Sequence, residues 1–243
     1  MFKRKNLQAL KFLANKDITP DDIIKIKKES FLNEPSETRE GIEFLLEHGK
    51  ILILKELGEP KGIIESINLE ALLNPVILQE ALIKLSPESP LRRVLENDAQ
   101  YGTLSSVRYE YPVRKNYHYG HGIAINPKGL GYGTRLFVET IRRLIGKDGL
   151  LFGFVIASPI NISPIRMALE QDTIIDKVED GVYAPGAKYL RLVYDKRVKN
   201  NSKDSQTVIL EGDYLARINI LLAQGYLATR FECPNTLVFN KRL

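Results

Sequence analysis

The chain has 243 residues, 44% of them hydrophobic and 27% charged, with a formal net charge of +5. This is an ordinary globular balance, and the length allows one large domain or two small ones. The single cysteine, Cys233, excludes an intramolecular disulfide, and His118 and His121 alone make a poor zinc site. The charge fits an anionic ligand but is too small to indicate nucleic acid. From the cysteine and histidine content we expect no metal site. The N-terminal residues do not resemble a signal peptide, and no run reaches about 20 apolar residues, so we expect no membrane span and a cytoplasmic location.

The first half of the chain is predicted to mix helices and strands. Thr19 is a typical N-cap, and Pro20 suits the first position of the helix that follows it. Gly49 is suited to end a second helix that opens at Ser36. In chain order we expect a strand or short helix over 7–13, helices over 20–31 and 36–48, a β-hairpin of strands 51–57 and 62–67, helices broken at prolines over 69–98, and a strand over 107–113.

The second half begins with a strand, a glycine loop and a helix. Residues 122–125 form the apolar strand, 127–133 the loop and 131–145 an amphipathic helix. Residues 150–157 are almost uniformly apolar, which is typical of a strand buried on both faces. The remaining elements expected are a helix from 163, strands over 174–182 and 188–194, a polar linker over 196–205, a strand over 207–210, a helix over 213–223, and strands near 226–231 and 237–240.

The glycine loop suits an anion. A helix start leaves backbone N–H groups without intrahelical partners, and the helix dipole adds partial positive charge there. Glycine lets an anion approach the backbone closely. Lys128 and Arg135 lie at the same end, where their charge opposes the dipole unless an anion lies between them. The sequence therefore predicts a phosphate or pyrophosphate site, although a simple strand–helix turn would show a similar glycine cluster.

Two segments resemble motifs of the GNAT N-acetyltransferase superfamily. Lys128-Gly-Leu-Gly131-Tyr-Gly133 is similar to motif A, in which a strand is followed by Arg/Gln-x-x-Gly-x-Gly/Ala and a helix. Asn161-Ile-Ser163-Pro-Ile165-Arg166 resembles motif B, in which a strand leads to an Asn and a helix. The resemblance covers about residues 1–197, with an insertion at about 69–100 and an extension at 198–243.

The resemblance implies an α/β fold with a mixed, mainly antiparallel sheet and helices on both faces. The residue pattern beyond it predicts a small C-terminal β-α-β-β extension. It places a cleft where the strand ending at Asn126 splays from the strand starting near Leu150. The implied reaction transfers an acetyl group from acetyl-CoA, or another acyl-CoA, to an amine by direct attack. The acceptor, a small molecule or a protein, is not readable from the sequence.

The resemblance also implies positions for the co-substrate. Backbone groups of Ile123 to Ile125 orient the thioester carbonyl, and Asn161 contacts the pantetheine arm while also serving as a helix N-cap. Arg142, Arg143 and Lys147 either form a solvated helix face or contact the adenosine 3′-phosphate. The pyrophosphate is expected on the backbone of Lys128, Gly129, Leu130, Gly131, Tyr132, Gly133, Thr134 and Arg135.

The proton-transfer groups are left as candidates. One of His118 and His121 can act as general base, but residues three apart on a regular strand face opposite sides, so at most one points into a given site. Glu65 and Glu110 are alternative candidates for the general base, and each is expected on a neighbouring strand. The motif B helix lacks the tyrosine that protonates the departing thiolate in many GNAT proteins, and the available replacements are Tyr111, Tyr117, Tyr119 and Tyr183.

Two other interpretations remain open. The missing motif B tyrosine favours a protein that binds acyl-CoA or a partner but catalyses weakly. Residues 198–243 echo residues 163–197 in element order. The echo indicates a partial repeat or arises by chance, since strand endings of this composition are common. The segment could also be a docking element that forms a homodimer.

Overall fold

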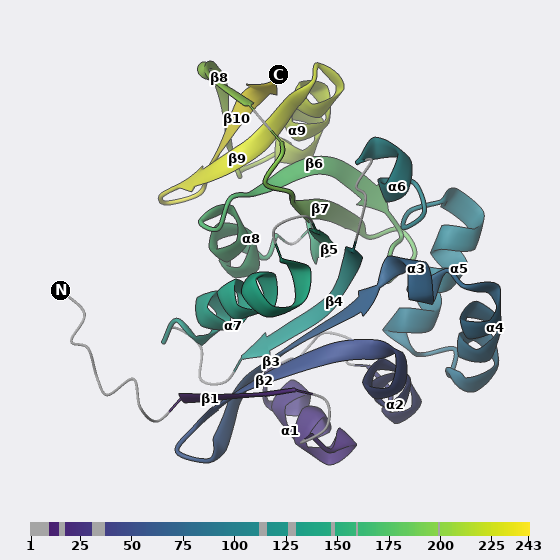
Figure 1. Cartoon of the computed structure of the whole chain (residues 1–243). Helices are drawn as coiled ribbons and strands as arrows, with labels where there is room; N and C mark the ends of the chain where they lie inside the picture. The colour runs from purple at the N-terminus through teal and green to yellow at the C-terminus, as the bar shows by residue number, and fades with distance from the viewer. Residues whose placement is uncertain are drawn as a thin grey trace.

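The computed structural model describes residues 10–14, 18–30, 37–111, 116–125, 130–146, 149–158, 160–198 and 200–243. Strands in this part of the chain form one sheet in the order β1-β2-β3-β4-β5-β7-β6-β9-β10-β8. Every neighbouring pair is antiparallel except β4 and β5, which are parallel (Figure 1). The strands are β1 (Leu10–Ala14), β2 (Gly49–Glu56), β3 (Glu59–Asn68), β4 (Tyr117–Ile125), β5 (Leu150–Ile156), β6 (Thr173–Asp180), β7 (Lys188–Tyr194), β8 (Asn200–Ile209), β9 (Tyr226–Glu232) and β10 (Thr236–Arg242).

Helices cover both faces of the sheet, as predicted (Figure 1). The first helices pack into one apolar cluster with one face of β2 to β4, whereas α7 shares a second cluster with the opposite face. The helices are α1 (Pro20–Ser30), α2 (Arg39–His48), α3 (Leu69–Leu72), α4 (Pro75–Lys84), α5 (Pro90–Tyr101), α6 (Val107–Glu110), α7 (Tyr132–Thr140) with its π-helical continuation Ile141–Ile145, α8 (Ile162–Leu169) and α9 (Tyr214–Ala223).

The helix starts follow from local capping chemistry. Thr19 and Asp22 bond reciprocally at the start of α1, because the Asp22 N–H donates to Thr19 Oγ1 and the Thr19 N–H donates to the Asp22 carboxylate. In the segment predicted to break at prolines, α4 and α5 each begin with a proline, after Asn74 and Ser89 as N-caps. The predicted breaks are therefore confirmed.

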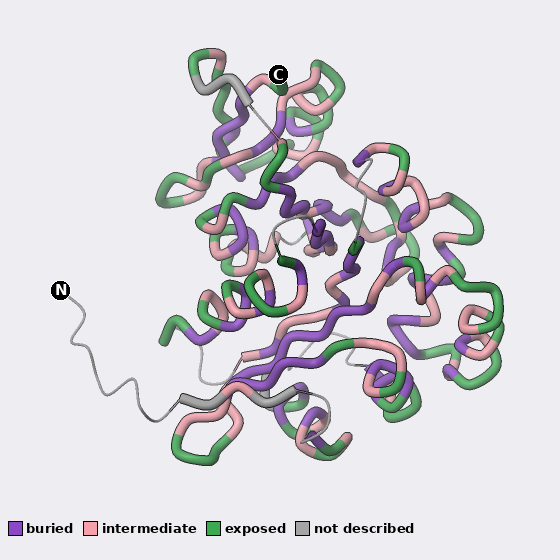
Figure 2. The backbone as a smooth tube through the Cα atoms, viewed as in Figure 1, coloured by how far each residue is buried: buried purple, intermediate pink, exposed green. Residues whose placement is uncertain are grey.

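Consecutive residues in the middle of β2 and β3 are buried, and Figure 2 shows the burial along the backbone. Ile51 and Ile53 of β2 belong to the cluster under α1 and α2, and Leu52 and Leu54 belong to the cluster under α7. A strand covered on both sides has no solvated face, so its sequence is a continuous apolar run without polar alternation.

Two predicted elements are wrong. The segment predicted as a strand over 107–113 begins with the short helix α6, because Asp98 Oδ1 accepts the N–H groups of Leu104 and Ser105 and turns the chain just before it. The predicted linker over 196–205 contains most of β8, an edge strand paired with β10. Polar, charged composition is typical of an exposed edge strand, where it discourages pairing with other chains. The undecided segment 7–13 includes β1, and Pro112 and Val113 lie outside the described residues.

The C-terminal extension has the expected order β8-α9-β9-β10. It continues the main sheet through one pairing between β6 and β9, Ile175↔Ala228. A third apolar cluster joins its strands to α8 and β7.

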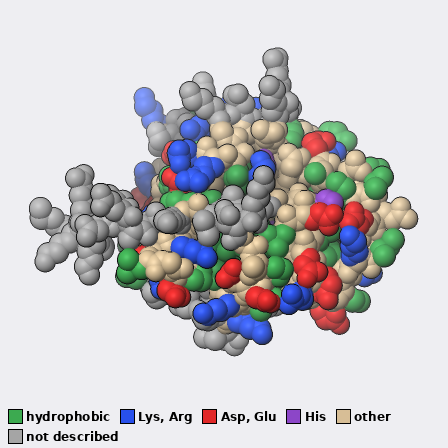
Figure 3. Space-filling model, turned by 60° about the horizontal axis from the view of Figure 1, so that its bottom comes forward, with side chains coloured by type: hydrophobic (Ala, Val, Ile, Leu, Met, Phe, Trp, Pro, Cys, Tyr) green, Lys and Arg blue, Asp and Glu red, His purple; other side chains and the backbone are tan. Residues whose placement is uncertain are grey.

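The surface is mixed in charge. The face shown in Figure 3 has Lys and Arg side chains interspersed with Asp and Glu, in agreement with the modest net charge. No helix in the described part of the chain has the length and apolar character needed to cross a membrane.

Candidate functional site

Strands β4 and β5 separate in the middle of the sheet. Their parallel pairing ends at Gly120↔Gly153, after which β4 runs on to Ile125 and β5 to Ile156 without pairing to each other. The strands approach closely at this last pair, because a Cβ on Gly153 would lie 3.0 Å from the carbonyl oxygen of Gly120. The predicted splay between these two strands is confirmed.

Helix α7 begins with an uncapped turn next to this separation. Its N-cap, Gly131, has φ +75°, makes no side-chain capping bond and has open space where a Cβ would stand. The backbone N–H groups of a first helical turn lack intrahelical partners, so this helix start has the geometry of an anion site. Arg135 is exposed at the end of this turn, whereas Lys128 and Gly129 lie outside the described residues.

Two residues of the glycine loop have structural explanations of their own. A Cβ on Gly133 would lie 2.8 Å from Ile125 Cδ1 and 3.0 Å from Met167 Sδ, so this glycine lets α7 pack against β4 and α8. The Tyr132 hydroxyl donates to Glu56 Oε2 at 2.6 Å, which ties the start of α7 to the end of β2. Of the loop glycines that the structure describes, Gly131 has the open approach that the anion hypothesis needs, and Gly133 does not.

The other predicted co-substrate contacts differ in their support. Asn161 is the N-cap residue of α8, as predicted, although its side chain makes no capping bond. Arg142 and Arg143 both pair with Glu139 on their own helix, which favours the solvated-face interpretation. Ile123 and Ile125 are half-buried, and their side chains pack in the cluster under α7. Leu130 is exposed, Thr134 is half-buried, and Lys147 lies outside the described residues.

His121 lies on β4 just past the point where β4 and β5 separate. It is the extra residue of a β-bulge, since Glu65 pairs with Gly122 and Ser66 with Gly120. Its Nε2 lies 2.7 Å from Glu37 Oε2, and its side chain is 3% exposed. Because an ionised carboxylate can only accept, Nε2 carries the hydrogen and Nδ1 is left as the basic nitrogen.

Tyrosine hydroxyls extend this pair. The Tyr119 hydroxyl lies 3.4 Å from His121 Nδ1 and 2.7 Å from the Tyr183 hydroxyl. Tyr183 comes from the turn between β6 and β7 and is half-buried, and Phe154 and Tyr189 pack against it edge to face. A continuous chain of polar atoms therefore runs from Glu37 through His121 and Tyr119 to Tyr183.

Glu37 is held by four donors. Its Oε1 accepts from the Thr38 N–H at 3.0 Å and the Ser89 hydroxyl at 2.5 Å, and its Oε2 accepts from the Leu91 N–H at 3.0 Å and from His121. Burial alone would raise its pKa, but the hydrogen bond and charge of His121, with help from Ser89 and Lys27, lower it to about 2. Glu37 is thus a permanent carboxylate beside an imidazole.

A second buried carboxylate lies on the neighbouring strand. Glu65 Oε2 is 2.7 Å from Lys27 Nζ, and the two side chains are 0% and 6% exposed. Glu65 also approaches β4, because a Cβ on Gly122 would lie 3.1 Å from Glu65 Oε2. A buried ion pair with this geometry makes Glu65 an electrostatic neighbour of the histidine rather than a free base.

Known proteins resemble the chain in structure rather than in sequence. Neither the family models nor the curated proteins include a match. Solved structures do: polyamine N-acetyltransferase from Drosophila melanogaster is 12% identical, with a TM-score of 0.54 over 76% of this chain and 99% of that one. Mosquito arylalkylamine N-acetyltransferase-like 5b is 13% identical, with a TM-score of 0.54 over 76% and 99% of the two chains. Arabidopsis thaliana NAA60 in complex with a bisubstrate analogue is 12% identical, with a TM-score of 0.50 over 76% and 97%.

The chain has the GNAT fold. At these identities the likeness establishes the architecture and the strand splay, and the chemistry has to be argued from the side chains. Residues 69–100, predicted to be an insertion, contain α3, α4 and most of α5, on the same face of the sheet as His121.

The structure separates the remaining candidates from this cluster. His118 is buried, and burial together with nearby Lys50 lowers its pKa to about 4; strand alternation turns it to the face opposite His121. Glu110 was expected on a strand, but it ends α6 and pairs with Arg191 and Lys177.

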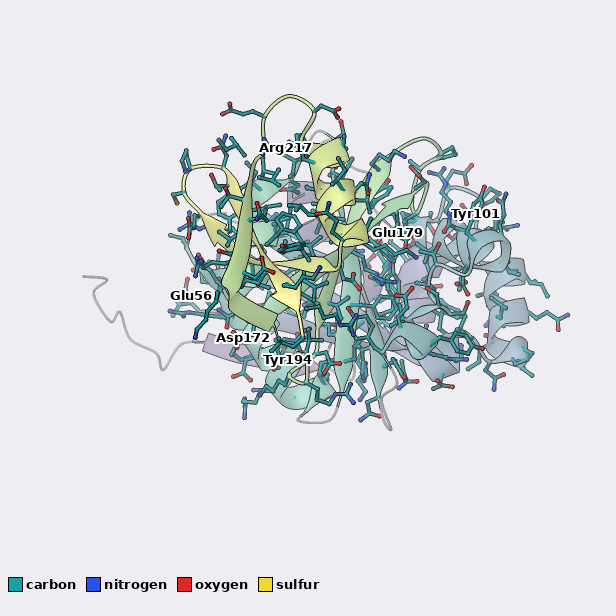
Figure 4. All side chains as sticks on the ribbon, turned by 90° about the horizontal axis from the view of Figure 1, so that it is seen from above. Glu56, Tyr101, Asp172, Glu179, Tyr194 and Arg217 are labelled. Carbon is teal, nitrogen blue, oxygen red and sulfur yellow. The ribbon has the colours of Figure 1, made fainter. Side chains whose placement is uncertain are left out.

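The region around Glu110 adjoins the C-terminal extension. Glu110 lines a cavity of about 410 Å³ with Arg191, Leu227 and Arg242. Seen from above (Figure 4), Glu179, which also lies near Arg191, is between the C-terminal segment and the helix that ends at Tyr101. Glu110 therefore belongs to a structural ion-pair group on β6 and β7.

Two tyrosine candidates are structural as well. The Tyr117 hydroxyl donates to the backbone oxygen of Tyr111 at 2.7 Å, and the Tyr111 hydroxyl donates to Asp176 at 2.6 Å. Of the catalytic candidates, the GNAT fold brings together His121, Tyr119 and Tyr183, with Glu65 beside them.

Glu37, Lys27 and Ser89 are the site residues that the sequence did not indicate. Glu37 immediately precedes the N-cap Thr38, where an acidic residue is already explained by the helix dipole. Ser89 is likewise explained as an N-cap. The residues around Glu37 and Ser89 in the sequence give no sign of a second role near His121, which is 84 positions beyond Glu37.

Proposed function

We propose that this protein is an acyltransferase that moves an acetyl group from acetyl-CoA to an amine. The observation that carries the proposal is the His121–Glu37 pair, buried beside the point where β4 leaves β5. A histidine oriented by a carboxylate is the arrangement expected of a general base near neutral pH. The GNAT fold of the chain supports acetyl-CoA as the co-substrate.

Acetyl-CoA would lie between the separated strands. The N-terminal turn of α7 at Gly131 would bind the pyrophosphate, and Asn161 at the start of α8 would contact the pantetheine arm. Backbone groups of β4 from Ile123 to Ile125 would orient the thioester carbonyl, with the charge that develops on its oxygen stabilised by an N–H donor. Holding both substrates in this geometry would supply much of the acceleration.

Proton transfer would run through the polar chain. His121 Nδ1 would remove the proton from the attacking amine, directly or through Tyr119, while Nε2–H donates to Glu37. The amine nitrogen bonds to the carbonyl carbon as the C–S bond breaks. The departing thiolate would take a proton from Tyr183, in place of the tyrosine that α8 lacks.

The cluster favours a cationic amine as the acceptor. The cluster contains two buried carboxylates, Glu37 and Glu65, and carboxylates attract an ammonium group. The rings of Phe154, Tyr183 and Tyr189 supply aromatic surface next to it. In this proposal the acceptor is an amine of a small molecule or of a protein. The protein acts in the cytoplasm and forms a homodimer through residues 198–243.

A catalytically weak acyl-CoA-binding protein is the second candidate. The absence of tyrosine from α8 (Ile162–Leu169) favours it. It predicts acetyl-CoA binding without amine-dependent release of CoA, so turnover assays separate the two functions.

Calorimetric titration with acetyl-CoA tests the co-substrate site. Gly131→Asp and Gly131→Asn are a matched pair, because both residues tolerate positive φ and only their charge differs. We expect micromolar binding by the wild type, and a Kd at least about tenfold higher for Gly131→Asp than for Gly131→Asn, since a carboxylate there repels the pyrophosphate. Equal affinities in the two variants, or no binding by the wild type, would remove the basis for the site. Gly133 is unsuitable for this test because its substitution disturbs packing.

A further inference from the structure

The start of helix α5 lies directly against the Glu37 carboxylate. Ser89, the N-cap, accepts the Arg92 N–H at 3.2 Å and donates its hydroxyl hydrogen to Glu37 Oε1 at 2.5 Å. The Leu91 N–H in the first turn donates to Glu37 Oε2 at 3.0 Å. One hydroxyl therefore both caps α5 and binds the residue that binds His121.

These contacts are buried and electrostatically consistent. Ser89 and Leu91 are both 0% exposed, and Glu37 is 6% exposed. Glu37 lies at the N-termini of two helices, α2 and α5, whose dipoles both favour a negative charge. Each of these donors makes a charge-assisted hydrogen bond to the carboxylate, and such bonds are stronger in a buried, low-dielectric region. Together they fix the orientation of the Glu37 carboxylate.

Helix α5 also contacts the other end of the polar chain. Arg93 Nη1 donates to the backbone oxygen of Tyr183 at 3.4 Å, and Asn97 Nδ2 donates to the backbone oxygen of Asp180 at 3.5 Å. Asn97 Oδ1 is in turn fixed by the Thr103 hydroxyl at 2.5 Å. One helix of the inserted segment therefore holds both Glu37 and the turn that carries Tyr183.

We propose that Ser89 and the first turn of α5 are positioning groups for acyl transfer: they fix the Glu37 carboxylate so that His121 keeps the hydrogen on Nε2 and presents Nδ1 as the base. This inference rests on the proposed acetyltransferase function. It gives the insertion a part in the catalytic apparatus, in addition to any part in shaping the acceptor pocket. Ser89 itself touches neither substrate nor the reacting atoms.

The test removes the Ser89 hydroxyl in two ways. Ser89→Ala removes the hydroxyl and the cap, whereas Ser89→Gly removes the hydroxyl but keeps a residue that costs little at an N-cap. Ser89→Thr retains the hydroxyl and serves as the rescue variant. Asn74→Ala is the matched control, because Asn74 caps α4 in the same insertion but has no bond to the polar chain.

Steady-state kinetics and nitrogen NMR of histidine-labelled protein give two readouts. We expect Ser89→Gly and Ser89→Ala to lower kcat about 10-fold to 100-fold with little change in the KM for acetyl-CoA, since one charge-assisted bond is lost. The ring nitrogen shifts of His121, assigned with His121→Gln, should show Nε2–H in the wild type and a mixture of tautomers in these variants. Ser89→Thr and Asn74→Ala should match the wild type in both readouts.

The outcomes distinguish the two proposals. A wild type that binds acetyl-CoA and acetylates amines, with Ser89→Gly equal to Asn74→Ala in kcat and in the His121 shifts, would overturn the positioning role and leave the function standing. A wild type without acetyl transfer would overturn the proposed function and this role with it.

Discussion

Replacing Glu37 by glutamine probes the pairing at the centre of the site. The substitution keeps the size of the side chain but removes its charge and leaves one acceptor oxygen for four donors. His121 then loses the partner that stabilises its ring when it takes up a proton. We expect a lower kcat with a nearly unchanged KM for acetyl-CoA.

The size of the effect follows from the charge balance at Glu37. Its pKa is lowered from 4.5 to about 2, which means that its surroundings favour the carboxylate over the acid by about 3 kcal/mol. Burial opposes this, and His121 is the largest of the favourable contributors, ahead of Ser89 and Lys27. Loss of the His121 share, about 1.5–3 kcal/mol for a charge-assisted hydrogen bond, corresponds to a decrease in kcat of about 10-fold to 150-fold.

The assay is initial-rate release of free CoA from acetyl-CoA with the best amine acceptor, at pH 7.5. Glu40→Gln is the matched control, because Glu40 is an exposed acid in the first turn of α2, the helix that begins just after Glu37. Thermal denaturation of both variants reports on folding. A folded Glu37→Gln protein with kcat within a factor of two of wild type would refute the catalytic pairing of Glu37 and His121.

Two further predictions concern candidates that the structure sets apart. His118 has its pKa lowered to about 4 by burial and Lys50, so the folded state resists protonation; its contribution to stability is complete above about pH 6.5 and falls as the pH drops toward 4. Urea denaturation should therefore show the wild type losing about 2 kcal/mol between pH 7 and pH 5, and His118→Gln losing much less; equal losses would contradict this. Glu110→Gln should leave kcat unchanged and cost up to about 1 kcal/mol of stability, because Arg191 keeps Asp176 as a partner. A tenfold loss of kcat in Glu110→Gln would contradict this and indicate a catalytic role for Glu110.

The sequence predicted the structure best where a local residue pattern is compatible with only one kind of secondary structure. Proline at the first position of α4 and α5, and the apolar runs of β2 and β5, each predicted the element that is present. The glycine loop predicted an uncapped helix start beside a strand, although packing accounts for Gly133.

The prediction failed where the same sequence pattern is compatible with two different structures. Residues 107–113 have the valine and tyrosine content of a strand, but the turn built on Asp98 starts a helix there. The polar residues of β8 are as typical of an edge strand as of a linker, and only pairing with β10 distinguishes the two.

The site itself depends on contacts that no local pattern contains. His121 meets Glu37 across 84 positions, and Glu37 meets Ser89 across 52. Both Glu37 and Ser89 lie at helix N-termini, where their residue types already have a local explanation. The histidine could be proposed because its chemistry is specific, whereas its carboxylate partner could be identified only from the fold.

Acetyl transfer by the wild-type protein is the most direct test of the account. Acetyl-CoA and a panel of primary amines would be incubated with the enzyme, with free CoA followed by thiol detection and the acetylated amine by mass spectrometry. The account predicts amine-dependent release of CoA in a one-to-one ratio with the N-acetylated product. Binding of acetyl-CoA without any amine-dependent product would contradict acyl transfer and favour the acyl-CoA-binding protein.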